Sequence, residues 1–290
     1  MTNETFSEKK QKTLKVLDGI HNLPTVANVM LETTKLLEDS STSTSTLSRI
    51  IGRDQGLSTK LLAIANSPIY GIPRKVSTID FAILVLGYQE IKNIIIGLSI
   101  METFKNMNDG VLDYKDLWLH SFLVGSLARR IALDMGYKIS GEAFIAGLLH
   151  ELAVSAIHKY FHSSFMKILD LSKSGEYKFI DAEEEILGLT HQEIGNNLVE
   201  KWNLPANLCN TVLYHHCPGK STNAVELVSL VHLADYFVSK WNFKNFFWDE
   251  GYVFDESVLN TLRFRDFEHI EQFMSQYQPI LETESKLIKF

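Results

Sequence analysis

Seven positions in the second half of the chain carry imidazole or carboxylate side chains that a helical protein could gather around a metal ion. They are His120, His150, Glu151, His191, His215, His216 and Asp235. Neutral imidazole and carboxylate groups bind iron, manganese, zinc or magnesium, in differing proportions. The apolar stretch VSLVHLADYFV surrounds Asp235, and burying a carboxylate there is costly unless it is paired or bound to a cation. A bound divalent transition metal, with iron or manganese as candidates, would explain why several ionisable side chains lie on apolar helices, and it is one of two interpretations that the residues leave open.

Asp116 extends this set, because it precedes His120 by four residues and so shares one face of a helix with it. It could be a further ligand, or it could orient the His120 imidazole through a hydrogen bond. A purely structural interpretation stays open for each imidazole, since a histidine on an apolar helix is more often a hydrogen-bonded core residue than a ligand. In an adjacent pair such as His215 and His216, one ring usually faces solvent. Spacing alone does not establish that the helices converge.

Helices must position these side chains, because nearly every periodic segment has apolar residues at helical spacing. Strand signals are poor, without clear alternating runs joined by Asn-Gly or Asp-Gly turns. We predict an all-α, multi-helix bundle in which an N-terminal helical subdomain packs on a helical core. In the second half we expect helices over about 114–135, 140–158, 163–174, 180–188, 190–202, 205–215 and 222–240, then a pair of tail helices.

The polar segment NMNDGVLD at 106–113 is the best candidate for a boundary within the chain, since it contains glycine and separates two helical patterns. On this basis residues 20–105 form the N-terminal helical part, which includes an expected helix over 25–38. Residues 113–240 form the core with the metal site. Residues 241–290 form an aromatic-rich C-terminal segment with the tail helices.

Charge restricts the classes of partner. The 290 residues carry a net charge of −7, and residues 1–110 alone carry +1, so neither part offers an extended cationic surface for nucleic acid. A helix pair around Gly56 with Arg49, Arg53 and Lys60 keeps nucleic-acid binding open only as a minor hypothesis.

Several features are typical of a cytoplasmic protein. Every apolar run is shorter than the roughly 18–20 residues that span a bilayer, so we expect no membrane association. The first residues, MTNETFSEKKQKTLK, are polar and unlike a secretory signal. The two cysteines, Cys209 and Cys217, fit free thiols in a reducing compartment.

A long and specific pattern in the first half resembles HDOD domains. It reads LSRIIGRDQGLSTKLLAIANSPIYG, in which Ile50 to Gly71 match the pattern IIxxDxxLxxKLLxxANSxxYG, and it is preceded by LPTVANVMLETTKLL. The likeness covers roughly residues 20–240. It implies an all-α fold and a role in bacterial signalling and regulation, without one settled activity.

The second half resembles the HD superfamily of metal-dependent phosphohydrolases, and above all its relatives with a GYP signature. The likeness implies that the seven positions, with Asp116, correspond to ligands of a two- or three-metal site. Three departures stand beside it: Glu151 replaces the Asp of the His-Asp pair, Ala153-Val154 replace the expected Gly-Lys, and Cys217-Pro218-Gly219 replace the GYP segment. The lysine that would hold a substrate phosphate is therefore missing at that place.

Two functions of different classes follow from this resemblance. The first is a non-catalytic, metal-binding regulatory module that contacts a signalling protein of unknown identity and does not hydrolyse cyclic dinucleotides. The second is a phosphohydrolase that acts on a nucleotide or phosphate ester through metal-bound hydroxide. A Glu side chain extends about 1.5 Å further than Asp, which disturbs a carboxylate that must bridge two metals. We favour the first function for this reason and for the missing lysine.

Overall fold

The chain folds into helices. The computed structural model describes residues 5–20, 42–104, 109–243, 248 and 253–288, and within these it contains α- and 3-10 helices and no strand. The all-α prediction is confirmed. The expected helix over 25–38 lies outside the described residues.

The N-terminal part supplies short helices that flank the rest of the bundle. Its elements are α1 (Phe6–Asp18), α3 (Thr44–Ile51), α4 (Gln55–Ala65), η1 (Pro68–Tyr70), α5 (Ile79–Leu86) and α6 (Tyr88–Thr103). Most of them begin at a Ser, Thr or Asp whose side chain accepts a hydrogen bond from a backbone N–H of the first turn; Ser43 before α3 and Asp54 before α4 are examples.

The C-terminal part contains the remaining helices, which include the longest described one, of 21 residues. They are α7 (Tyr114–Asp134), α8 (Ser140–Leu149), α9 (Leu152–Tyr160), α10 (His162–Lys173), α11 (Phe179–Leu187), α12 (His191–Lys201), α13 (Ala206–Tyr214), η2 (Pro218–Lys220), α14 (Val225–Trp241), α15 (Ser257–Thr261), α16 (Phe267–Met274) and α17 (Gln278–Leu287). Among the described residues, three tail helices follow α14, rather than the expected pair.

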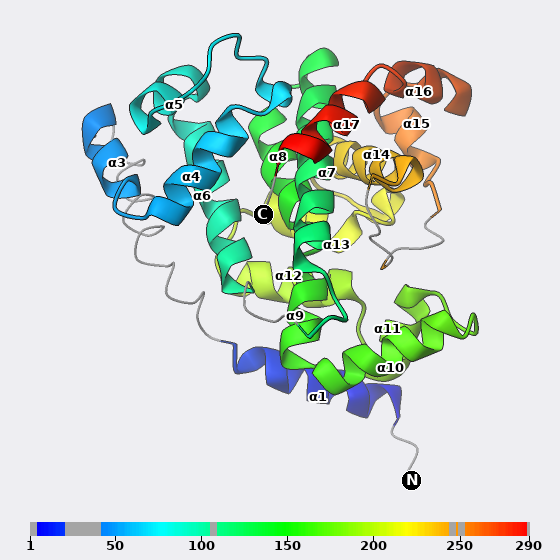
Figure 1. Ribbon diagram of the computed structural model, residues 1–290. Helices are drawn as coiled ribbons and strands as arrows, with labels where there is room; N and C mark the ends of the chain where they lie inside the picture. The colour runs from blue at the N-terminus through cyan, green and yellow to red at the C-terminus, as the bar shows by residue number, and fades with distance from the viewer. Residues whose placement is uncertain (1–4, 21–41, 105–108, 244–247, 249–252, 289–290) are drawn as a thin grey trace.

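The helices are arranged around α7 and α8 (Figure 1). Helices α3 to α6 lie on one side, α10, α11 and α1 form one end, and the tail helices lie at the other end. Helix α6 packs against α8, and one continuous group of buried apolar side chains includes residues of both parts of the chain. The division at 106–113 therefore separates two helical patterns that share a core, and the domain limits stay a prediction.

Two glycines let α7 and α8 approach backbone to backbone. A Cβ added to Gly147 would lie 2.6 Å from the Gly125 Cα, and one added to Gly125 would lie 2.5 Å from the Phe144 carbonyl oxygen. No ordinary side chain fits at either place. The close approach brings the segment that carries His120 next to the end of α8, where His150 follows.

The expected helix over 140–158 is broken in the middle, which corrects that prediction. His150 and Glu151 form a turn between α8 and α9, with Glu151 at φ −98° and ψ 12°. Ser140–Tyr160 has the length and mean hydropathy, 1.2, of a membrane span, but 83% of its window is buried inside the protein.

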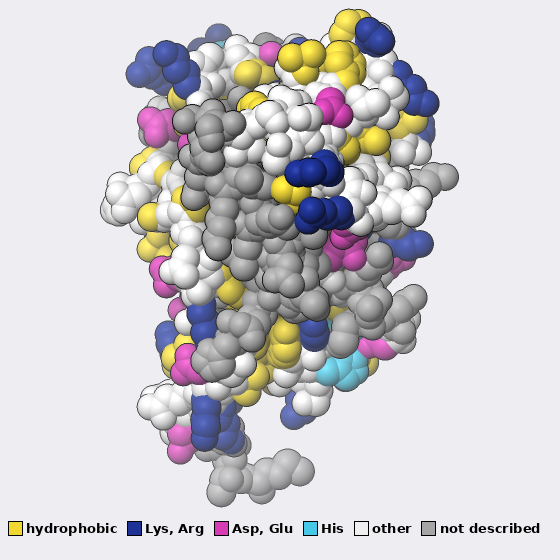
Figure 2. Space-filling model, turned by 90° about the vertical axis from the view of Figure 1, so that its left-hand side faces the viewer, with side chains coloured by type: hydrophobic (Ala, Val, Ile, Leu, Met, Phe, Trp, Pro, Cys, Tyr) yellow, Lys and Arg dark blue, Asp and Glu magenta, His cyan; other side chains and the backbone are white. Residues whose placement is uncertain are grey.

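The face formed by the N-terminal helices has a mixed surface. Among its described residues, Figure 2 shows Lys and Arg side chains in small separate groups between hydrophobic and uncharged ones. Leu84, Val85 and Tyr88 of the α5–α6 corner are exposed apolar or aromatic side chains.

Candidate metal centre

The seven candidate ligands converge in the interior of the C-terminal part. They come from five places in the bundle: the second turn of α7, the break between α8 and α9, the start of α12, the end of α13 and the middle of α14. In that order they are His120; His150 and Glu151; His191; His215 and His216; and Asp235.

The first group of ligands consists of His120, His150 and Asp235. The Nε2 atoms of the two rings lie 3.1 and 3.5 Å from Asp235 Oδ1, and the three side chains are at most 4% exposed. A cation with ligands at about 2.0–2.2 Å holds neighbouring ligand atoms roughly 3 Å apart. The geometry of this group therefore suits one metal ion.

The second group consists of Glu151, His191, His215 and His216. The Nε2 atoms of the three rings lie close to Glu151 Oε1: that of His191 at 3.7 Å, that of His215 at 3.6 Å and that of His216 at 3.9 Å. The Nε2 atoms of His191 and His216 are 3.0 Å apart. The carboxylate oxygen and the three imidazole nitrogens therefore lie close enough together to surround one cation.

The two ligand groups lie next to each other. His150 Nε2 lies 4.0 Å from Glu151 Oε1, and the His150 and His215 rings are in edge-to-face contact with centroids 5.1 Å apart. All seven side chains form one cluster, which we call the buried cluster. The structure brings Asp116 into neither group, and this residue is half-buried one turn before His120.

Three rings of the buried cluster are held in the tautomer that a metal ligand requires. His150 Nδ1 lies 2.6 Å from the Gly147 carbonyl oxygen, and His215 Nδ1 lies 2.8 Å from the Val212 carbonyl oxygen. A carbonyl oxygen can only accept, so each proton sits on Nδ1 and the Nε2 lone pair faces the cluster. Each of these two rings bonds the carbonyl three residues earlier, in the last turn of its own helix. The residues present therefore fit a bound metal.

The third ring, His191, is held by a carboxylate that the sequence did not single out. Glu183 of α11 accepts hydrogen bonds from His191 Nδ1 at 2.8 Å, from the His191 backbone N–H at 2.7 Å and from Trp248 Nε1 at 2.6 Å. The sequence could have indicated that Glu183 is buried, because it lies four residues from both Phe179 and Leu187 and so shares the apolar face of its helix with them. Within an acidic run, it is the member that faces the core.

His232 is a second residue that the sequence analysis missed. Its Nδ1 donates to the His215 carbonyl oxygen at 2.7 Å, and its Nε2 accepts from the Asp255 backbone N–H at 2.9 Å. Burial lowers the pKa of His232 to about 4, so the ring is neutral at neutral pH. It ties α14, which carries Asp235, to the backbone of His215.

The electrostatics of the buried cluster keep the His215 ring neutral and the Asp235 carboxylate anionic. Burial, with the neighbouring His216 and His150, holds the pKa of His215 well below its usual range. Burial opposes ionisation of Asp235, but electrostatic attraction to the neighbouring His150 and His120 side chains outweighs it and holds that pKa well below its usual range. These are the protonation states in which both groups bind a metal.

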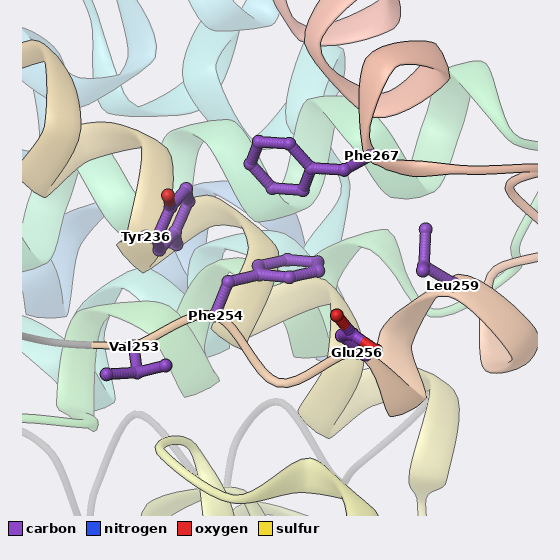
Figure 3. Close-up of a pocket in the computed structure, with 6 residues that line it drawn as sticks. All are labelled: Tyr236, Val253, Phe254, Glu256, Leu259 and Phe267. Atoms are coloured by element: carbon purple, nitrogen blue, oxygen red, sulfur yellow. The ribbon is translucent and has the colours of Figure 1, made fainter.

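The buried cluster is closed to solvent. The most exposed of its seven side chains, His216, is 6% exposed, and the residues in place of the expected Gly-Lys, Ala153 and Val154, are fully buried. A pocket of about 370 Å³ lies nearby, lined by Tyr236, Val253, Phe254, Glu256, Leu259 and Phe267 (Figure 3). None of these lining residues is a candidate ligand.

Comparison with known proteins gives a consistent picture. The sequence model of the HDOD domain matches residues 23–218. A crystal structure of an HDOD domain protein of unknown function from Geobacter sulfurreducens has a TM-score of 0.78 and 25% identity, covering 98% of this chain and 99% of that one.

Two further proteins are similar. A structure of a candidate phosphohydrolase from Shewanella amazonensis SB2B has a TM-score of 0.73 and 20% identity, over 95% and 97% of the two chains, and supports the fold alone. An uncharacterized protein of Treponema pallidum is 24% identical over 222 residues, which are 76% of this chain and 43% of that protein. The chain thus spans less than half the length of this curated relative.

Proposed function

The chain belongs to the HDOD domain family, and from this premise we propose that it is a regulatory, signal-transducing module. In this proposal the buried cluster binds a divalent transition metal, iron or manganese first, and a signalling protein reads the state of the module through direct contact in the cytoplasm. The module does not hydrolyse cyclic dinucleotides.

The closure of the buried cluster is the observation that carries this proposal. Structural metal sites are filled by protein ligands, whereas catalytic sites keep an open position for water or substrate. Here the first ligand group has three side chains and the second has four, but all seven are buried, and the most exposed of them is 6% exposed, so neither group faces solvent. A phosphate ester would have to displace packed side chains in order to reach the centre.

Two substitutions relative to the HD superfamily support the same conclusion. Val154 is buried and apolar where a lysine would neutralise a phosphate, so that position supplies no charge to a substrate. Glu151 has a longer side chain than the Asp it replaces, and its Oε1 lies 3.6 to 3.9 Å from three imidazole nitrogens. Its carboxylate is therefore central to one ligand group.

In this proposal His120, His150 and Asp235 would hold one cation. Glu151, His191, His215 and His216 would hold a second. A bound cation would supply positive charge that cross-links the helices around it. Glu183 and His232 orient His191 and the His215 segment, respectively, whether or not a cation is present.

The alternative is a metal-dependent phosphohydrolase acting on a nucleotide or phosphate ester. One observation favours it: the two ligand groups are adjacent, with His150 Nε2 4.0 Å from Glu151 Oε1. Cations bound by both groups would be neighbours, and two cations about 3.5–4 Å apart are typical of two-metal phosphatases. In that case the closed cluster must open during turnover.

One experiment separates the two functions. Protein purified anaerobically under reducing conditions is analysed for iron, manganese and zinc, then incubated with cyclic dinucleotides and a panel of nucleotides and phosphate esters with added manganese or iron. We expect bound metal and no turnover above that of the His150→Ala variant. Turnover that His150→Ala abolishes establishes the alternative, and metal-free protein refutes the metal part of the proposal.

A further inference from the structure

A second group of possible ligands lies at the opposite end of α9 from the buried cluster. Helix α9 starts directly after Glu151, and His158 lies in its last turn. His162 begins α10, and Asp109 precedes α7. The Oδ2 atom of Asp109 lies 2.8 Å from His158 Nε2 and 3.6 Å from His162 Nδ1.

The three ligand atoms have the separation that a small cation imposes. All three lie within 4.8 Å of one another. Ligands at about 2.0–2.1 Å from a tetrahedral zinc ion are roughly 3.4 Å apart, which falls between the two measured distances to Asp109. The side chains of Asp109 and His162 are 31% and 50% exposed, so one side of this group is open to water.

The His158 ring is held as a metal ligand would be. It is fully buried, packs edge to face on Phe165 with centroids 4.6 Å apart, and its Nδ1 lies 2.7 Å from the Tyr114 hydroxyl. The second ring nitrogen of a ligating histidine usually bonds a protein oxygen in this way. Nε2 is consequently aimed at Asp109.

The Asp109 carboxylate is also held in position for metal binding. Its Oδ1 accepts a hydrogen bond from the Val111 backbone N–H at 2.9 Å. Burial opposes ionisation of Asp109, but the hydrogen bonds from the Val111 backbone N–H and from His158 together outweigh it and lower the pKa of Asp109 below its usual value. The group is therefore anionic at neutral pH, as a ligand must be.

We propose that Asp109, His158 and His162 form a second metal site, which takes a divalent transition cation such as zinc and leaves one coordination position open. Tyr114 is a positioning residue that orients His158. Two imidazoles and one carboxylate are a three-ligand set that zinc accepts. The proposal stands independently of the function proposed for the buried cluster.

The hydrogen bond between His158 and the Tyr114 hydroxyl can be kept when a cation binds, because the ring proton can move from Nε2 to Nδ1. In the metal-free group Nε2–H donates to Asp109 and Nδ1 accepts from the Tyr114 hydroxyl. When a cation takes Nε2, the ring proton sits on Nδ1 and donates to the same hydroxyl, which both donates and accepts. Burial raises the pKa of Tyr114, so its hydroxyl stays protonated in both arrangements.

The competing interpretation is that Asp109 and His158 only fasten the start of α7 to the end of α9. Such a pair would need neither His162 nor Tyr114 in its present place. The His162 side chain is 50% exposed and its ring contacts the His158 ring edge to face, so its replacement tests metal binding while leaving the fully buried side chains in place.

Zinc titration of the full chain tests the proposal. Protein stripped with a chelator is titrated with Zn²⁺ against a chromophoric competitor at pH 7, and retained zinc is counted after gel filtration. We expect His162→Gln and Asp109→Asn each to remove one zinc equivalent, and Tyr114→Phe to weaken that equivalent about 10-fold or more. His269→Gln, a histidine on α16 outside both groups, is the control and should bind as the wild type does.

A second variant keeps the two sites distinguishable. Asp235→Asn disrupts the buried cluster and should leave unchanged the zinc equivalent that His162→Gln removes. Equal zinc stoichiometry and affinity in the wild type, His162→Gln and Asp109→Asn would overturn the proposal. Loss of zinc in Asp235→Asn alone would place all binding in the buried cluster and overturn it too.

Discussion

The indole of Trp248 and the imidazole of His191 share one carboxylate. Trp248 Nε1 donates to Glu183 Oε1 at 2.6 Å, and His191 Nδ1 lies 2.8 Å from Glu183 Oε2. All three side chains are fully buried. Trp248 also stacks on Phe165 and Phe179, so the aromatic-rich segment at the C-terminal side contributes an anchor behind the candidate metal centre.

Trp248→Phe should weaken metal binding in the buried cluster without emptying it. The change keeps an aromatic ring in the stack but removes the donor to Glu183, which then holds His191 less rigidly. Loss of such an outer hydrogen bond typically weakens metal affinity about 10- to 100-fold. Competition with a chelator of known affinity measures this. Trp241→Phe, which alters a ring packed on Phe237 in α14, is the matched control, and equal affinities in both variants would show that the indole donor has no such role.

Glu151→Gln should remove the metal bound by the second ligand group and spare the first. Gln has nearly the same shape, but its neutral amide oxygen binds a divalent transition cation more weakly than the negatively charged carboxylate that faces the three imidazoles. We expect one metal equivalent fewer by elemental analysis. Glu151→Asp keeps the charge and serves as the control. Equal metal content in Glu151→Gln and the wild type would mean that this carboxylate is not a ligand.

The sequence predicted the positions of the helices and the candidate ligands better than it predicted where one helix ends and the next begins. Apolar spacing predicted the helices between residues 114 and 241 to within a few residues, apart from one break, because each has one face in a shared core. It did not predict the break at His150 and Glu151, where no Gly or Pro marks a helix end. There, the His150 ring bonds the Gly147 carbonyl, a partner that only the folded bundle fixes.

The same distinction applies to the candidate site. The seven positions could be named because imidazole and carboxylate are conspicuous in apolar stretches. Glu183 and His232 were missed, because each acts on a ligand from another helix: Glu183 on His191 and His232 on the His215 backbone. Asp116 was included on helical spacing alone, and the structure brings it into neither ligand group.

Gly147→Ala should destabilise the fold by about 1–3 kcal/mol, the usual penalty for overpacking a core. The added Cβ would lie 2.6 Å from the Gly125 Cα, so α7 and α8 must move apart. Thermal unfolding followed by circular dichroism measures the change. Gly56→Ala in α4 is the control: its Cβ meets only an ordinary contact with Asp54 at 3.4 Å, and it should stabilise the helix by about 0.5–1 kcal/mol. Equal unfolding temperatures for the two variants would contradict the close packing.

A buried carboxylate in the last helix should make stability depend on pH. Glu284 of α17 accepts hydrogen bonds from the Ser67 hydroxyl and, at 2.9 Å, from the Ile69 backbone N–H. Burial raises the pKa of Glu284 above its usual 4.5, and these hydrogen bonds offset only part of the effect. The folded state therefore binds this proton more tightly than the unfolded state. The resulting stability is present below pH 4.5 and is lost as the pH rises through the higher pKa of the folded state.

Glu284→Gln should remove that decline, because its amide does not titrate. Its unfolding temperature, measured at steps upward from pH 4.5, is expected to fall less with rising pH than that of the wild type. Glu268→Gln on α16 replaces an exposed carboxylate and should follow the wild-type curve. If the Glu284→Gln and wild-type curves stay parallel over this range, Glu284 is as ionised in the folded chain as in the unfolded one. Its contact with η1 would then be an ordinary hydrogen bond between a charged carboxylate and the N-terminal part.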